Sequence, residues 1–127
     1  MKAFDLDGVL VPDFLHVPQL ATEQEFFLMT LSIVPLFQPQ GQWQVITARP
    51  PQFRAITLQW IQQHFANPPQ HVWHENYQNQ PAEYKALTIN QNHITLYVES
   101  DKKICTYLSQ HTACKIVHFS DYLSQQW

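Results

Sequence analysis

Two aspartates and a glycine near the start of the chain have the spacing of a catalytic carboxylate pair. In "FDLDGVL", residues 4–10, Asp5 and Asp7 follow a short apolar run, and Gly8 is one of only two glycines among 127 residues. A turn alone explains an isolated Asp-x-Asp-Gly equally well. A residue without Cβ also lets the chain turn sharply and lets a substrate approach the backbone. We therefore take Asp5 and Asp7 as candidate catalytic and metal-binding residues, and Gly8 as a candidate substrate-binding residue.

Further candidates with complementary chemistry occur later in the chain. The polar ones are Thr47, Arg49, Lys85, Glu99 and Asp101, and Ala48 is a candidate through the backbone amide that follows Thr47. Each has an ordinary explanation when taken alone. Thr47 and Asp101 are residue types that cap helices, and Lys85 fits a solvated helix face. These separate explanations leave open why anionic, cationic and hydroxyl groups should gather at the ends of neighbouring strands.

The apolar pattern predicts short strands that alternate with helices, without internal repeats. Such alternation predicts a parallel α/β sheet, in which ligands bind beyond the carboxyl ends of the strands. A capping box at Thr22 and Glu25 begins the first predicted helix. The predicted strands cover residues 2–6, 42–47, 70–75, 94–100 and 114–120, and the predicted helices cover residues 21–34, 50–65, 81–89, 101–111 and one turn in 121–127.

The candidate carboxylates predict a divalent cation. Asp5, Asp7 and either Glu99 or Asp101 would repel one another by about 4 kcal/mol per close pair at the effective dielectric of a surface site. Oxygen ligands with room for water favour Mg²⁺ over zinc. Lys85 and the amides after Thr47 could hold a phosphate. The combination indicates phosphoryl transfer.

In their order along the chain, these residues resemble the motifs of the haloacid dehalogenase-like (HAD) superfamily. "DLDGVL" is similar to its first motif, "VITARP" to the second, Lys85 to the third and "YVESD" to the fourth. The fourth departs from the family pattern, and either Glu99 or Asp101 remains open as the metal ligand. The resemblance covers residues 5–101.

The resemblance implies a role for each residue. Asp5 attacks the phosphorus and forms an aspartyl-phosphate, and Asp7 acts as general acid and then base, with its backbone carbonyl on Mg²⁺. Thr47 and Lys85 hold the phosphoryl oxygens. Arg49 assists substrate binding.

The resemblance also implies a Rossmann-like three-layer fold with a parallel five-stranded sheet in the order 5-4-1-2-3. The gaps at residues 9–43 and 50–84 leave no room for a cap domain beyond elements that the fold needs. The segment "VPDFLHVPQL", residues 11–20, would then form a small flap with Phe14, Leu15 and His16 over an open site. An open site suits a large substrate or cover from a second subunit, so an oligomer is compatible with it.

Length and composition narrow the class of protein. One domain covering residues 1–127 is expected at this size, and the formal net charge of -3 with seven Lys and Arg residues argues against nucleic-acid binding beyond a terminal phosphate. Cys105 and Cys114 fit reduced thiols in the core. With neither a signal peptide nor an apolar span, the chain is expected in the cytoplasm, without membrane contact. Strand alternation puts His71 and His74 on opposite faces, which argues against the binding of one metal ion by both histidines.

The sequence therefore favours a Mg²⁺-dependent phosphatase that acts on a phosphate monoester, either a small molecule or the phosphorylated end of a macromolecule. Two other interpretations stay open. A non-catalytic module of the same fold would bind a phosphorylated ligand or partner. A stable phosphoacceptor at Asp5 would serve signalling, although its phosphorylated aspartate would be expected on a later strand.

Overall fold

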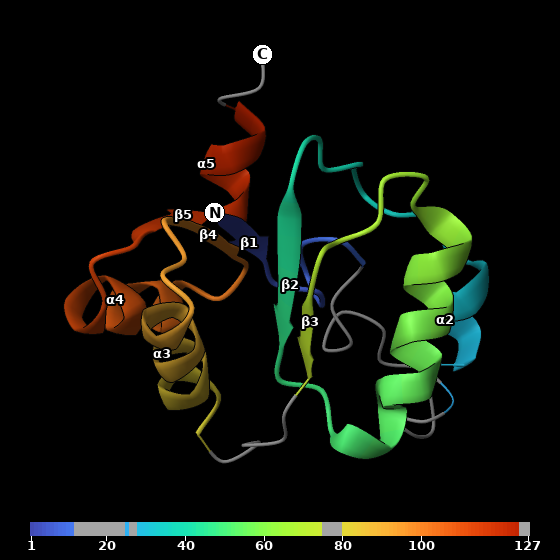
Figure 1. The fold of residues 1–127 in the computed structure, drawn as a ribbon, viewed down its shortest axis with the longest axis horizontal. Coiled ribbons are helices and arrows are strands. Elements are labelled where there is room, and N and C mark those ends of the chain that lie inside the picture. Colours follow the sequence, from blue (N-terminus) through green and yellow to red (C-terminus); the bar gives the residue numbers. More distant parts are fainter. Residues whose placement is uncertain (12–24, 26–27, 75–79, 125–127) are drawn as a thin grey trace.

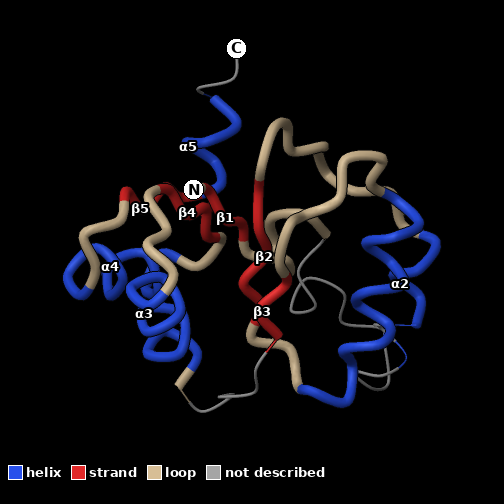
Figure 2. The backbone as a smooth tube through the Cα atoms, viewed as in Figure 1, coloured by secondary structure: helices blue, strands red, loops and turns tan. Residues whose placement is uncertain are grey.

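A parallel sheet of five strands forms the centre of the protein in the computed structural model, which describes residues 1–11, 25, 28–74 and 80–124. The strand order is β3-β2-β1-β4-β5, with helices on both sides (Figure 1, Figure 2). Read from the other edge, this is the predicted order 5-4-1-2-3, and the predicted α/β class is confirmed. No cap domain is evident among the described residues. The strands are β1 (Lys2–Phe4), β2 (Trp43–Thr47), β3 (Val72–His74), β4 (Leu96–Glu99) and β5 (Lys115–His118).

The helices form two layers, one on each face of the sheet (Figure 1). Helices α3 and α4 cover one face, and α2, η2 and α5 contribute to the core on the other. None of the helices in the described part has the length and apolar character needed to cross a membrane. Their bounds are η2 (Thr30–Ser32), η3 (Pro51–Phe53), α2 (Arg54–His64), α3 (Pro81–Gln91), α4 (Lys102–His111) and α5 (Phe119–Ser124).

Strand alternation divides the core into two clusters. Phe4 and Val45 belong to the cluster that contains Trp60 of α2. Ala3 and Ile46, one position away on the same strands, belong to the cluster against α3 and α4. Neighbouring side chains of a strand point to opposite faces, so a sheet covered on both sides needs apolar residues at consecutive positions. This explains why these strands lack an apolar and polar alternation.

The first strand ends earlier than predicted, at Phe4 instead of Leu6. The Asp5 amide still donates to the Val98 carbonyl at 2.9 Å, but the Leu6 carbonyl accepts bonds from the amides of residues 9, 10 and 11 and so closes a tight turn. Gly8 has a φ of 84° in this turn, a conformation that favours glycine. The expected role of Gly8 in a sharp turn is confirmed.

Other boundaries also differ from the prediction. The helix predicted over residues 21–34 passes into the 3-10 turn η2 and ends at Ser32, because the residue before Pro35 disfavours helical geometry. Thr22 lies outside the described residues. The last predicted strand stops at His118, and α5 begins at Phe119. The flap residues Phe14, Leu15 and His16 also lie outside the described residues.

Candidate active site

Asp5 and Lys85 form the buried centre of the site. Asp5 follows β1, and one of its carboxylate oxygens, Oδ1, accepts the Leu6 amide at 2.8 Å and lies 3.2 Å from Lys85 Nζ. Lys85 projects from α3 and is only 3% exposed, so the alternative of a solvated surface lysine is wrong. The pairing compensates two charges that would be costly to bury separately.

Glu99, at the end of β4, is the second partner of Lys85. Its Oε1 accepts Lys85 Nζ at 2.7 Å and the Tyr97 hydroxyl at 3.1 Å. Its Oε2 accepts the amides of Ser100 at 2.9 Å and Asp101 at 3.1 Å. Both oxygens of Glu99 are thus engaged in orienting Lys85 and the loop after β4.

The ionisation of this buried cluster is uneven. Burial, and then the neighbouring Glu99 carboxylate, raises the pKa of Asp5 well above its ordinary value, although Lys85 acts in the opposite direction. Burial also opposes the charge of Glu99, but Lys85 and the hydrogen bonds to Glu99 together lower its pKa. Burial alone would lower the pKa of Lys85, yet the two carboxylates raise it overall. Lys85 Nζ also lies closer to Glu99, at 2.7 Å, than to Asp5, at 3.2 Å, so Glu99 is its closer partner.

Asp7 lies in a different environment from Asp5. Arg49 Nη2 and Nε donate to its two carboxylate oxygens at 2.6 and 2.9 Å. The side chain of Asp7 is 24% exposed, whereas that of Arg49 is 2% exposed. Arg49 Nη1 also donates to Thr57 Oγ1 of α2 at 3.1 Å. Arg49, predicted to assist substrate binding, is here the partner of Asp7.

The end of β2 and the loop that follows it carry the other predicted phosphate-binding groups. Thr47 is 1% exposed, and its Oγ1 accepts the Arg49 amide at 3.2 Å. A hydroxyl that accepts one bond keeps its own proton to donate, so Thr47 can also bind an anion. Ala48 is half-buried and packs against the apolar cluster under α3.

Ser100 joins the two halves of the site. Its hydroxyl donates to Asp5 Oδ2 at 3.4 Å and to the Asp7 backbone carbonyl at 3.2 Å. The Asp101 side chain, in contrast, caps α4 by accepting the amides of Lys103 at 2.8 Å and Ile104 at 3.1 Å. The structure thus brings together all the predicted polar side chains except that of Asp101, for which it confirms the helix-capping alternative.

The residues around Asp5 fit a hard divalent cation. Asp5 Oδ2, the Asp7 carbonyl and Ser100 Oγ converge, and all three are oxygens, the ligand type that Mg²⁺ prefers. Neighbouring ligands of an octahedral Mg²⁺ site lie about 2.9 Å apart, close to the 3.2 and 3.4 Å found here. Among the described residues, no three His, Cys, Asp or Glu side chains form a metal-binding group. A cation here would instead use a carbonyl and a hydroxyl in addition to one carboxylate.

His74 extends the site beneath Arg49. This histidine ends β3 and is 4% exposed; its Nε2 lies 3.3 Å from Thr57 Oγ1, and its Nδ1 has no hydrogen-bond partner in the described structure. Burial, reinforced by the charge of Arg49, lowers the pKa of His74 to about 4. His71 lies one residue before β3 and is exposed.

We expect His74 to make stability depend on pH. The unfolded chain protonates this histidine below about pH 6.5 but the folded protein only below about pH 4. The free energy of unfolding should therefore fall as the pH drops through this interval, by up to about 3 kcal/mol. Urea unfolding between pH 4 and 7 measures the slope. His74→Phe should flatten it and His71→Phe should not; equal slopes for both variants would contradict this account of His74.

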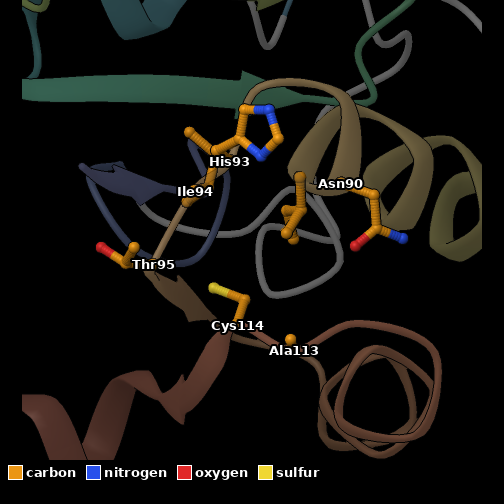
Figure 3. A pocket seen from close by; sticks show the side chains of 7 residues that line it. Asn90, His93, Ile94, Thr95, Ala113 and Cys114 are labelled. Atoms are coloured by element: carbon orange, nitrogen blue, oxygen red, sulfur yellow. The ribbon is translucent and has the colours of Figure 1, made fainter.

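A cavity of about 270 Å³ lies at the amino ends of β4 and β5, away from the carboxyl ends where the site lies (Figure 3). It is lined by residues before β4 and β5, among them His93, Thr95 and Cys114. Burial raises the pKa of Cys114 to about 11, so its thiol is protonated at neutral pH and a poor nucleophile. Because its lining residues precede the strands, the cavity is separate from the acidic site, which lies at the carboxyl ends of the strands.

Comparison with known proteins found no match: no family model, no curated protein and no solved structure matches this chain. The functional interpretation therefore depends on the residues and their geometry.

Proposed function

We propose that this protein is a Mg²⁺-dependent phosphohydrolase that cleaves phosphate monoesters through a phosphorylated Asp5, as its resemblance to the HAD superfamily implies. The observation that carries the proposal is the contrast between two carboxylates two residues apart. The side chain of Asp5 is 8% exposed and pairs with the buried Lys85, whereas that of Asp7 is 24% exposed. Burial raises the pKa of Asp5 and so favours its protonated form. Mg²⁺ at Asp5 Oδ2 would supply the positive charge that keeps this carboxylate ionised as a nucleophile. Two carboxylates in different environments can then take different catalytic roles.

The reaction has two displacements at phosphorus. In the first, an oxygen of the Asp5 carboxylate forms a bond to phosphorus while the bond to the leaving oxygen breaks, and Asp7 supplies the proton that this oxygen needs. In the second, water attacks the phosphorus of the aspartyl-phosphate, Asp7 takes its proton, and phosphate and free Asp5 result. A covalent intermediate divides one slow hydrolysis into two easier steps.

Lys85 and Thr47 have the chemistry to hold the transferred group. The Lys85 ammonium and the Thr47 hydroxyl proton can both bind phosphoryl oxygens as charge develops on them. When bound at Asp5 Oδ2 and the Asp7 carbonyl, Mg²⁺ would also neutralise the negative charge that develops on the phosphoryl oxygens. For Asp7 to reach the substrate, its two bonds from Arg49, at 2.6 and 2.9 Å, must be exchanged. Arg49 can then bind the incoming anion in place of Asp7.

The substrate class follows from access and charge. No cap domain covers the site among the described residues, which suits the terminal phosphate of a macromolecule, such as a polynucleotide 3′-phosphate, as well as a nucleotide or sugar phosphate. The net charge of -3 argues against long contacts with nucleic acid.

Magnesium dependence of turnover tests the proposal. Hydrolysis of an aryl phosphate should be measurable with Mg²⁺ and should fall to background when EDTA removes the cation, with recovery when excess Mg²⁺ is added. Release of phosphate is the measurement. A folded protein without turnover on a panel of phosphate esters at any Mg²⁺ concentration would contradict the proposed activity.

A binding module is the second candidate, and one observation favours it. Ser100, a neutral residue, faces Asp5 in the loop after β4, while Asp101 caps α4. A site with a neutral side chain in place of a carboxylate at this position could hold a phosphorylated ligand without hydrolysing it. Calorimetric binding of a phosphate ester that remains intact after long incubation with Mg²⁺ would support the module over the enzyme.

A further inference from the structure

Ser100 is held rigidly at the meeting point of Asp5 and Asp7. Its amide donates to Glu99 Oε2 at 2.9 Å, and its carbonyl lies 2.9 Å from His118 Nε2 of β5. The other ring nitrogen of His118 lies 2.7 Å from Ser120 Oγ, which orients the ring. With its backbone fixed on both sides, Ser100 presents its hydroxyl to Asp5 Oδ2 and the Asp7 carbonyl.

The two carboxylates on either side of Ser100 have other partners. Glu99 accepts four hydrogen bonds, two of them from Lys85 and Tyr97. Asp101 Oδ1 accepts two amides of α4. Using Glu99 as a ligand would break part of its arrangement, and the Asp101 side chain is held at the start of α4, whereas the Ser100 hydroxyl is already placed beside Asp5.

We propose that Ser100 Oγ is the third protein ligand of the divalent cation, beside Asp5 Oδ2 and the Asp7 carbonyl, and that this neutral ligand keeps cation affinity low. This inference rests on the proposed metal-dependent function. A hydroxyl has lone pairs for a cation and can turn its proton toward water. Because cation affinity follows the number of charged ligands, a site with one charged ligand binds weakly and responds to changes in the Mg²⁺ concentration.

Direct titration with Mg²⁺ tests the role of Ser100 without any substrate. Isothermal calorimetry should show tighter binding to Ser100→Asp than to the unaltered protein, by about tenfold or more, because a charged ligand is added. Ser100→Ala should bind more weakly, since water replaces the hydroxyl. Ser100→Asn retains a neutral oxygen and should bind more tightly than Ser100→Ala, which keeps the test decisive if Ser100→Asp does not fold.

Two controls separate this inference from the proposed function. Ser109→Asp adds the same charge at an exposed position of α4 and should leave the affinity unchanged. Asp5→Asn removes the shared charged ligand and should abolish binding. If Asp5→Asn abolishes binding while all three Ser100 variants bind like the unaltered protein, the role of Ser100 is overturned and the phosphatase proposal stands. If the unaltered protein shows neither binding nor Mg²⁺-dependent turnover, both are overturned.

Discussion

Asp5→Asn should lower the rate of phosphate-ester hydrolysis by about a thousandfold or more. The amide has nearly the shape of the carboxylate and can still accept the Leu6 amide bond, found at 2.8 Å, but it is a far weaker nucleophile toward phosphorus. Initial rates at saturating Mg²⁺ and substrate measure the effect. Asp121→Asn, an exposed acid of α5, should retain full activity.

The stability of Asp5→Asn distinguishes lost chemistry from lost structure. Burial and the neighbouring Glu99 raise the pKa of Asp5, which means that its charge is costly in the folded protein. The neutral amide should therefore leave the free energy of unfolding unchanged or slightly higher. Retained turnover in this variant would show that another group attacks the phosphorus, and the proposed role of Asp5 would be lost.

Lys85→Met should destabilise the fold by about 3 to 5 kcal/mol at neutral pH. The ammonium lies 3.2 Å from Asp5 and 2.7 Å from Glu99, and its removal leaves two buried carboxylates without their cation. Methionine retains much of the apolar stem, so the loss reports mainly on charge. Urea unfolding monitored by tryptophan fluorescence measures the effect.

The pH dependence of the Lys85→Met deficit identifies its cause. Without Lys85 the folded pKa of Glu99 should rise above that of the unfolded chain, and the folded pKa of Asp5, already raised, should rise further. The deficit should then be complete at neutral pH and shrink as the pH falls toward about 4, where the unfolded chain also takes up these protons. Lys103→Met, an exposed change on α4, should alter stability by less than about 0.5 kcal/mol. A comparable small change for Lys85→Met would contradict the buried ion-pair cluster.

The sheet was predictable because its signals are local and repeated. Each strand carries two or three consecutive apolar residues, and strand ends are marked by polar residues such as Thr47 and Glu99. Boundaries were less predictable where one stretch fits two structures. In "VHFS" the apolar pattern fits a strand, but Phe119 and Tyr122 pack into the core from α5, so tertiary packing decides the outcome.

Much of the candidate site was predictable from residue type and order, but its pairing was not. The bond between Arg49 and Asp7 joins residues 42 positions apart and depends on two loop conformations that have no periodic signal. The meeting of Ser100 with Asp5 depends on the loop after β4 in the same way. Tyr97 could have been found, because it lies two residues before Glu99 and strand alternation places both on one face.

Identification of the phosphorylated residue is the most direct test of the central claim. The protein can be mixed with a reactive phosphate ester and Mg²⁺, quenched in acid, treated with borohydride and digested for mass spectrometry. Borohydride reduces an aspartyl-phosphate to homoserine, so the account predicts homoserine at position 5 only in samples that received substrate. Full turnover with unmodified Asp5, or a phosphoryl group found on another residue, would contradict it.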